Sequence, residues 1–214
     1  TALSKLTPGE ASLMRAIGEA ELRAGRTARA AEWFHRAAAA EPDFALGWNS
    51  LAYAQAYLGD RSAALKSVER YRQLDPGGAN PLDSAGEIHF HFGAFEEAAR
   101  CFLDAHAKDS GFLGGGALHK AAWARLLAGD RRAAGELHER FLAARAELKD
   151  PLVPIRRAQW EMATGQGEAA LKGLEDLAAG ERERNPELAA LAGVQLALWR
   201  VQMGDRAQAR ELAA

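Results

Sequence analysis

The sequence predicts an all-α protein built from a row of antiparallel helix pairs. Three observations support this prediction. Residues 48–76 have the pattern of two short helices joined by a tight turn, the turn glycine recurs along the chain, and small residues stand at fixed distances on either side of it. One such pair cannot bury the apolar faces of both its helices by itself. We therefore expect about six pairs to stack and to share a core.

Residues 48–76 contain the pattern of one pair. Gly59 stands where a helix end favours a residue that tolerates positive φ, and Asp60 can cap the next helix through its carboxylate. Pro76 ends the second helix, because proline lacks a backbone N–H and disfavours helix at the preceding residue. Core-facing positions recur every three or four residues, which is the spacing of one helix face. They are Leu51, Ala52, Gln55 and Leu58 in the first helix, and Ala64, Leu65, Val68 and Tyr71 in the second.

The turn glycine gives the length of the repeat, because it recurs at intervals of 34, 34, 36, 36 and 39 residues. A small residue stands seven positions before each glycine, and an alanine stands five positions after it. The glycines are Gly25, Gly59, Gly93, Gly129, Gly165 and Gly204. The small residues before them are Gly18, Ala52, Gly86, Ala122, Ala158 and Ala197, and the alanines after them are Ala30, Ala64, Ala98, Ala134, Ala170 and Ala209.

This period of about 34 residues, with two helices per unit, resembles the tetratricopeptide repeat family over nearly the whole chain. The resemblance implies a right-handed superhelical solenoid in which the first helix of each pair lines a concave face. Members of that family usually hold an extended peptide or a partner's helix on this face. The sequence of residues 80–102 is also similar to that of repeat arrays attached to bacterial signalling proteins.

The repeat register sets the expected boundaries. We expect helices near residues 8–24, 27–40, 44–58, 61–74, 81–92, 95–108, 116–128, 131–147, 152–164, 167–179 and 186–203, and a last helix from about 206. The repeats then cover approximately 11–44, 45–78, 79–112, 115–148, 151–184 and 190–214 of a single domain, residues 1–214, with the last repeat truncated. Residues 1–6 have the pattern of an earlier helix's end, and Thr7 with Glu10 that of a capping box.

Composition narrows the class of function. Lys and Arg number 27 against 29 Asp and Glu, and the two signs are interspersed, so we expect no nucleic-acid partner. No stretch approaches the roughly 18 apolar residues of a membrane span, so we expect no membrane partner. No signal peptide is recognisable, but the first residue has the character of a cut end, so this absence assigns no compartment. The compartment stays unknown, with the cytoplasm favoured over export. The single cysteine, Cys101, excludes an internal disulfide and is expected to pack as a buried thiol.

Polar and aromatic side chains occur together on the face of the first helices that points away from the Leu51–Ala52 side. Tyrosine and tryptophan supply large rigid contact areas, while amide and carboxylate groups orient a ligand. The alternative is that some of these aromatic side chains simply pack against the next repeat. The candidate binding residues are Asn49, Tyr53, Tyr57, Asp83, Glu87, His91, His119 and Trp123.

Two other kinds of site use residues in the same region. Glu87 and His91 lie one helical turn apart and could ligate zinc with His119, but a Glu-x-x-x-His pattern arises easily by chance. The glycines at 114–116 could cradle a phosphate, but no Lys-Ser/Thr follows and no strand precedes them, so we expect a loop between repeats. We therefore expect no metal, no cofactor and no catalytic residue.

The sequence thus predicts a non-catalytic scaffold that binds a protein or peptide in the groove of its repeats. The alternative is a structural or self-associating spacer segment of a larger bacterial signalling protein. Terminal pairs could then join copies of the chain into a homo-oligomer, because an uncapped repeat leaves an apolar face exposed.

Overall fold

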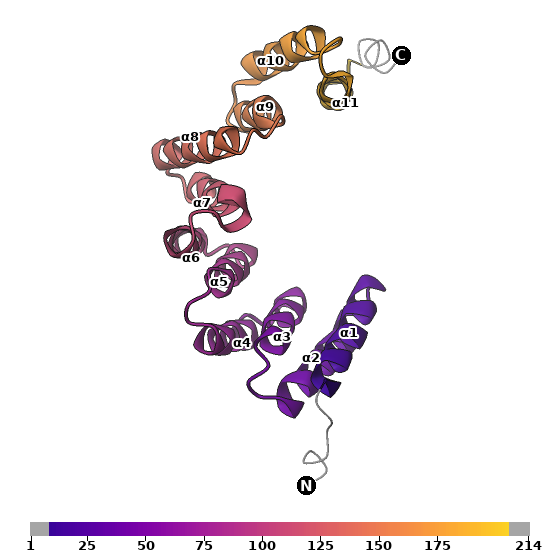
Figure 1. Cartoon of the computed structure of the whole chain (residues 1–214), viewed down its shortest axis with the longest axis vertical. Coiled ribbons are helices and arrows are strands. Elements are labelled where there is room, and N and C mark those ends of the chain that lie inside the picture. Colours follow the sequence, from indigo (N-terminus) through magenta and orange to yellow (C-terminus); the bar gives the residue numbers. More distant parts are fainter. Residues whose placement is uncertain (1–8, 206–214) are drawn as a thin grey trace. The chain divides into compact units, whose positions relative to one another are not determined.

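The computed structural model describes residues 9–205, which form eleven α-helices and one short 3-10 helix, η2 (Figure 1). Within the described residues, helices that follow one another pack together from α1 to α7 and again from α9 to α11. The elements are α1 (Glu10–Arg23), α2 (Thr27–Ala40), α3 (Ala45–Tyr57), α4 (Arg61–Leu74), α5 (Asn80–His91), α6 (Phe95–Lys108), η2 (Phe112–Gly115), α7 (Gly116–Leu127), α8 (Arg131–Glu147), α9 (Val153–Ala163), α10 (Gly167–Gly180) and α11 (Pro186–Gln202).

This all-α arrangement of antiparallel pairs confirms the fold class predicted from the sequence. Helices α2, α4, α6 and α8 have the predicted bounds, and the other seven begin and end within two residues of them. Three predictions lie outside the described residues: the helix end at 1–6, the capping role of Thr7, and the last helix from 206.

The turn at residues 59–60 shows why glycine recurs between the helices of a pair. Gly59 has a φ of 83°, in the left-handed region that a side chain disfavours. Its N–H donates to the carbonyl of Ala56, and the N–H of Asp60 donates to the carbonyl of Gln55, both at 2.9 Å. The Asp60 carboxylate then accepts a hydrogen bond from the N–H of Ala63 at 2.9 Å, which caps α4. All six turn glycines have φ between 73° and 94°, so the predicted turns are confirmed.

Two compact units divide the chain, residues 1–141 and residues 142–214, with the boundary inside α8. In the first unit, the first helices of the pairs (α1, α3, α5 and α7) lie on one side, and the second helices α2, α4 and α6 lie on the other (Figure 1). Helix α3 contacts both α1 and α5 directly. That residues 1–214 form one single domain stays a prediction.

Small residues lie where the helices of a pair approach most closely. Gly86 of α5 faces the buried ring of Phe102 on α6, and Gly18 of α1 faces the buried ring of Phe34 on α2 in the same way. A Cβ atom added to either glycine would lie 2.5 Å from the Cε1 atom of the facing ring. These two pairs therefore combine the smallest residue with a large one, and their backbones approach closely for that reason.

Hydrogen bonds to proline carbonyls connect successive repeats. The Arg70 guanidinium of α4 donates to the carbonyl of Pro42 at 3.2 Å, and the Lys108 ammonium of α6 donates to the carbonyl of Pro76 at 3.2 Å. Each proline follows the second helix of the preceding pair. A cation near the C-terminal end of α4 or α6 thus binds the loop that follows the second helix of the preceding pair.

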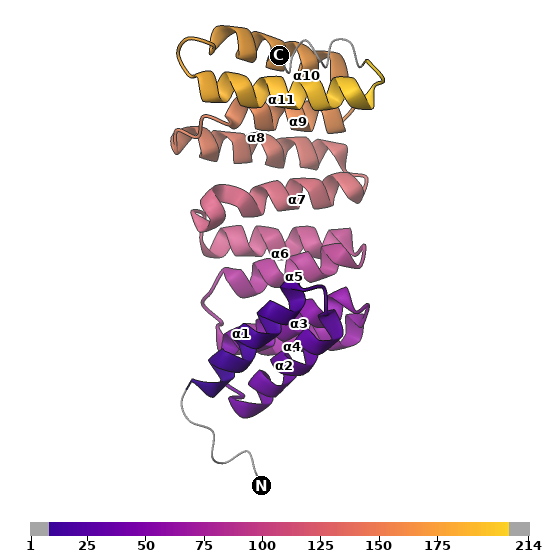
Figure 2. The same ribbon diagram turned by 90° about the vertical axis from the view of Figure 1, so that its right-hand side faces the viewer.

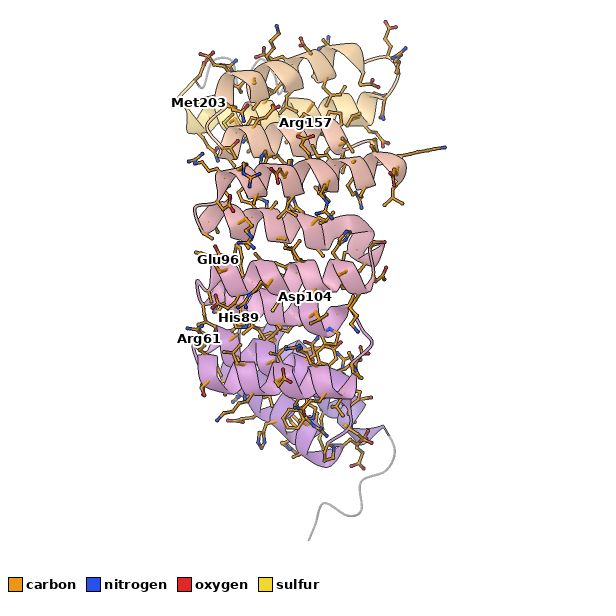
Figure 3. All side chains as sticks on the ribbon, turned by 90° about the vertical axis from the view of Figure 1, so that its left-hand side faces the viewer. Arg61, His89, Glu96, Asp104, Arg157 and Met203 are labelled. Carbon is orange, nitrogen blue, oxygen red and sulfur yellow. The ribbon has the colours of Figure 1, made fainter. Side chains whose placement is uncertain are left out.

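The side of the first unit formed by the second helices is charged. Figure 3 faces this side, with Arg61 of α4 and Glu96 and Asp104 of α6 labelled; all three are exposed.

The three glycines at 114–116 follow helix α6, not a strand, so the stretch lacks the setting of a phosphate-binding loop. Leu113, Gly114 and Gly115 have φ values of 52°, 58° and 79°, and α7 begins at the next residue. The expected connection between repeats is therefore a tight left-handed turn.

The second unit has its own core between α9, α10 and α11, and Figure 2 shows α11 in front of the other two. The Asp150 carboxylate joins α8 to α9: it accepts hydrogen bonds from the N–H of Leu152 at 3.0 Å, from Arg145 at 2.7 Å and from Arg156 at 3.1 Å. The buried core residues are Ile155, Ala158, Ala170, Leu174, Leu188, Ala192, Leu196 and Trp199.

Candidate functional site

A cleft of about 380 Å³ opens on the first-helix side of the first unit. Most of its lining is apolar or aromatic, and one carboxylate and one ammonium group stand beside these surfaces. The lining residues are Tyr53, Ala56 and Tyr57 of α3, Glu87, Ile88, Phe90 and His91 of α5, Phe102 of α6, and Lys120 and Trp123 of α7.

Helical spacing brings the aromatic side chains to the cleft. Tyr53 and Tyr57 are four residues apart on α3, so they share one face, and their ring centroids lie 6.4 Å apart. The Tyr57 ring then meets the His91 ring of α5 edge-on, with centroids 6.0 Å apart. Tyr57 is 56% exposed, so its ring also offers a free surface to a ligand.

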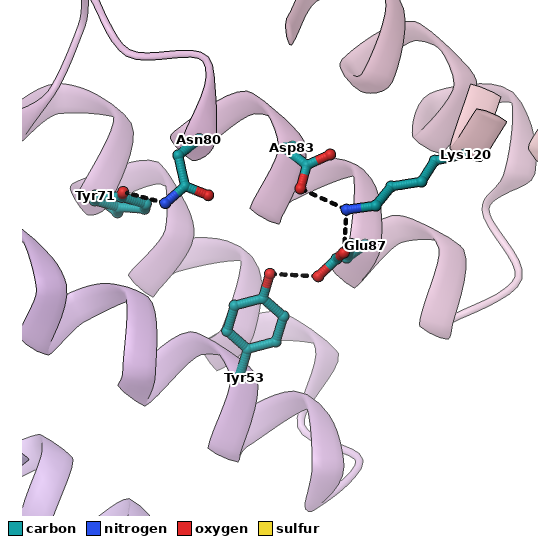
Figure 4. Close-up of polar contacts among 6 residues, drawn as sticks. All are labelled: Tyr53, Tyr71, Asn80, Asp83, Glu87 and Lys120. Carbon is teal, nitrogen blue, oxygen red and sulfur yellow. Dashed lines mark hydrogen bonds and ion pairs between the residues drawn. The ribbon is translucent and has the colours of Figure 1, made fainter. Parts of the chain in front are cut away.

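A polar network crosses three successive first helices beside the aromatic side chains (Figure 4). The Tyr53 hydroxyl of α3 donates to Glu87 Oε2 of α5 at 2.5 Å. The Lys120 ammonium of α7 donates to Asp83 Oδ2 of α5 at 2.6 Å and also to Glu87 Oε1. Each repeat from the second to the fourth therefore supplies at least one member, and the network links α3, α5 and α7.

Burial and charge set the ionisation of this network. Burial raises the pKa of the Asp83 carboxyl above its ordinary value, although Lys120 opposes the rise. Burial alone lowers the pKa of the Lys120 ammonium, but its hydrogen bonds to Asp83 and Glu87 outweigh burial, and the net pKa is raised. Burial, and then the bond to Glu87, raise the pKa of the Tyr53 phenol. Tyr53 is therefore a neutral donor at physiological pH, and Lys120 is a cation.

Lys120 has one more donor to offer. An ammonium group carries three N–H donors, and two of them go to Asp83 and Glu87. Its nitrogen lies 5.6 Å from the centroid of the buried Phe102 ring, so the group stands over an apolar floor. A carbonyl oxygen that entered the cleft could accept the third bond.

The structure brings most of the predicted site residues together. Five of the eight line the cleft: Tyr53, Tyr57, Glu87, His91 and Trp123. Asp83 lies behind them, 4% exposed, and takes part through Lys120. Asn49 lies half-buried on α3 and does not line the cleft.

His119 also lies outside the cleft lining and packs in the interior between α7 and α8. Its ring lies 4.6 Å from that of Phe141 and 5.8 Å from that of the buried His138, measured between centroids. Trp123 Nε1 donates to His119 Nε2 at 3.1 Å. The alternative that some groove residues pack against a neighbouring helix therefore holds for His119, which positions Trp123 at the cleft.

Sequence reasoning missed Lys120, which joins the two acidic residues of α5. It follows His119 directly, and adjacent helical residues point in directions about 100° apart, so it was not projected onto the same face. Its partners Asp83 and Glu87 precede it by 37 and 33 residues. That separation is close to one repeat and is the only sequence signal that could have identified the pairing.

The zinc alternative is not supported by the geometry. Within residues 9–205, no three His, Cys, Asp or Glu side chains are grouped as a metal site requires. His91 is exposed beside Tyr57, whereas His119 packs on Phe141.

No helix among the described residues has both the length and the apolar composition needed to cross a bilayer.

Solved structures of similar fold were found at low sequence identity. PilF of Pseudomonas aeruginosa is 19% identical over 94% of this chain and 88% of its own, with a TM-score of 0.64. The fold is tetratricopeptide-like. PilW, a widely conserved type IV pilus biogenesis factor, has the same tetratricopeptide-like arrangement, with 18% identity over 96% of this chain and 91% of its own and a TM-score of 0.64.

A third tetratricopeptide-like match is much longer. A chain of the Cut9–Hcn1 hetero-tetramer of the APC/C is 16% identical over 99% of this chain but only 40% of its own, with a TM-score of 0.64. Identities this low establish the fold alone. No protein-family model matches the sequence, and no curated protein matches it either.

Proposed function

We propose that the cleft on α3, α5 and α7 binds a peptide segment of another protein and that the chain acts as a scaffold without catalysis. The observation that carries the proposal is a concave, largely aromatic cleft whose polar network is already assembled. Sites that recognise ligands commonly combine an apolar surface with a few fixed polar groups in this way.

The aromatic side chains argue for a bulky apolar anchor on the peptide. Tyr57 and Trp123 come from different helices and border the same 380 Å³ cleft. Large, rigid aromatic side chains dominate binding energy at protein interfaces, and they do so in sites from which water is excluded. A leucine, methionine or aromatic side chain of the peptide would displace water from this apolar lining.

The polar network argues for orientation of the peptide backbone. Asp83, Glu87 and Lys120 carry a net charge of −1 and are already paired, so binding does not have to order them. The remaining Lys120 donor suits a backbone carbonyl, while the net negative charge disfavours an acidic side chain at this point. We therefore propose a neutral or basic peptide segment.

The fold is compatible with this role. The Cut9 chain, which shares it, was solved in a hetero-tetramer with Hcn1, so this kind of helix array can assemble with other protein chains. The partner of the present chain, and its place in a larger bacterial signalling protein, stay predictions.

Selection from a random-peptide display library on the immobilised protein tests the proposal. The selected peptide is then titrated by fluorescence anisotropy against Tyr57→Ala, Trp123→Ala and a control, Trp33→Ala. Trp33 is an aromatic residue of α2 that contacts Arg36 and lies outside the cleft. We expect each cleft variant to weaken binding by at least about tenfold and the control to bind normally. Equal binding by all three variants would contradict the proposal.

A further inference from the structure

A second groove lies on the other side of the first unit, between helices α2 and α4. Two adjoining cavities of about 260 Å³ and 480 Å³ form it, and they share the lining residues His35, Leu51 and Gln55. Its walls belong to α2 and α4 and its floor to α3, so it lies on the second-helix side, which Figure 3 faces. We call it the α2/α4 groove.

The walls of the α2/α4 groove carry small side chains. Ala31 of α2 and Ala63 of α4 both line it. The same positions of the next repeat, 34 residues later, hold the larger Leu65 and Glu97. Leu65 packs against the core cluster that α4 shares with α5. The alanine at position 31 therefore leaves open a space that a leucine occupies one repeat further along.

The floor of the α2/α4 groove is apolar and contains one oriented amide group. Leu51 is buried in the floor, and the Trp48 ring borders it with its N–H already donated to the carbonyl of Pro42 at 3.0 Å. The buried Ser67 hydroxyl donates to Gln55 Oε1 at 2.7 Å. That bond turns the NH₂ group of Gln55, with its two donors, away from Ser67. An apolar surface with a fixed polar group is typical of a recognition site.

The rim of the α2/α4 groove is positively charged. Lys66 and Arg36 line it beside the Glu32 carboxylate, so these three side chains carry a formal charge of +1. Within residues 9–205, neither cation belongs to an ion pair. The Arg36 guanidinium lies 4.1 Å from the centroid of the Trp33 ring, which holds it in place without using its N–H donors. Both cations are therefore available to an acidic ligand.

We propose that the α2/α4 groove binds an acidic segment of another protein chain, which places one apolar side chain in each of the two cavities. The charge of the rim is opposite to that of the network in the cleft, so the two sides of the first unit select segments of opposite charge. The apolar floor favours a peptide over a nucleic acid, because phosphate groups would leave it uncovered. The first unit then joins two different protein segments, one on each side.

Selection of peptides on the whole chain tests this inference. A display library of random peptides rich in Asp and Glu is selected on the immobilised protein, and the strongest binder is titrated by fluorescence anisotropy. Ala31→Leu copies the leucine of the next repeat into the groove, so we expect it to keep the helix content and to weaken binding at least about tenfold. The matched control is Ala143→Leu, at an exposed alanine of α8 outside the groove, which should bind like the native chain.

A charge reversal tests the rim of the groove independently. Lys66 is exposed, so Lys66→Glu leaves the core intact. We expect it to weaken binding of the same peptide at least about tenfold at low salt, and to reduce the further loss of affinity on adding salt. The control is Lys172→Glu, at an exposed lysine of α10 in the second unit, which changes the net charge by the same amount and should bind normally.

The outcomes separate the α2/α4 groove from the cleft. If no acidic peptide is selected, or if either Ala31→Leu or Lys66→Glu binds it like the native chain, the inference is overturned. Trp123→Ala should leave this binding unchanged, and a peptide that it releases occupies the cleft instead. A random oligonucleotide that binds the native chain but not Lys66→Glu would assign the groove to nucleic acid and equally overturn the inference. Because the two sites share no lining residue, either can fail alone.

Discussion

At Gly86, a single added methyl group should have a clear effect on the free energy of unfolding. A Cβ at Gly86 would lie 2.5 Å, 2.6 Å and 3.0 Å from the Cε1, Cδ1 and Cζ atoms of Phe102. The Phe102 side chain is 1% exposed, so it cannot swing into solvent to make room. Gly86→Ala therefore forces the α5/α6 pair apart or moves the ring out of its rotamer.

Two opposing effects set the magnitude. Overpacking of a well-filled core costs about 1–3 kcal/mol. Replacing glycine by alanine inside a helix gains about 1 kcal/mol. Gly173→Ala in α10 measures the gain alone, because a Cβ there would meet nothing within 4 Å. We expect Gly173→Ala to raise the free energy of unfolding by about 1 kcal/mol. The free energy of unfolding of Gly86→Ala should lie about 1–3 kcal/mol below that of Gly173→Ala.

The assay is urea unfolding followed by circular dichroism on both variants and on a rescue. In the α3/α4 pair, the positions of Gly86 and Phe102 are occupied by Ala52 and Val68, and Val68 is smaller than phenylalanine. The double variant Gly86→Ala with Phe102→Val therefore copies the α3/α4 arrangement into α5/α6. Adding Gly86→Ala should destabilise the native protein but stabilise the Phe102→Val variant, a sign change that shows coupling between the two sites. If Gly86→Ala stabilised the protein as much as Gly173→Ala does, the close-approach argument would be refuted.

Three further predictions concern charged and reactive groups. Lys120→Met leaves the Asp83 carboxylate buried without its cation, so it should destabilise the fold by about 1–3 kcal/mol at neutral pH. The loss should shrink as the pH falls, because Asp83, whose pKa is already raised, becomes protonated; unfolding at two pH values checks this. Burial tends to raise the pKa of Asp150, but the Leu152 N–H and two arginines outweigh burial and lower the pKa below its ordinary value. The contribution of Asp150 to stability is therefore fully present above the ordinary pKa of an aspartate and is lost as the pH falls through the lowered pKa. Asp150→Asn should therefore destabilise the protein by about 1 kcal/mol at neutral pH and approach the native protein's stability in acid, measured by thermal unfolding. Burial raises the pKa of the Cys101 thiol, so it should react with a thiol reagent more slowly in the folded than in the unfolded chain, with similar rates as the contrary result.

The helix pairs could be predicted because their signals are local. A glycine at each turn, an aspartate such as Asp60 after it, and a proline such as Pro76 at a helix end each act on the backbone of their immediate neighbours. The glycine recurs at all six turns, whereas an aspartate follows it at three of them and a proline closes the first two units. The glycine register therefore corrects an error at any one repeat. Boundaries accordingly came within two residues along the described chain.

The candidate site was predictable only in part, because its chemistry depends on contacts between repeats. The faces of α3 and α5 followed from helical spacing, which placed Tyr53, Tyr57, Glu87 and His91 in one region. Spacing could not show that Lys120 reaches back to α5. Nor could it show that His119, one turn before Trp123, turns inward onto Phe141.

For residues 9–205, the sequence by itself determined the order and limits of the helices, since turns, caps and apolar periodicity depend on residues a few positions apart. Only the tertiary structure decided which inward side chains enclose a cleft, which carboxylates share an ammonium group, and which face of α11 packs on α9 and α10. The physical reason is that these properties depend on how neighbouring helices approach one another. That approach is set by paired side-chain sizes such as those of Gly86 and Phe102, whose effect appears only once the helices are packed.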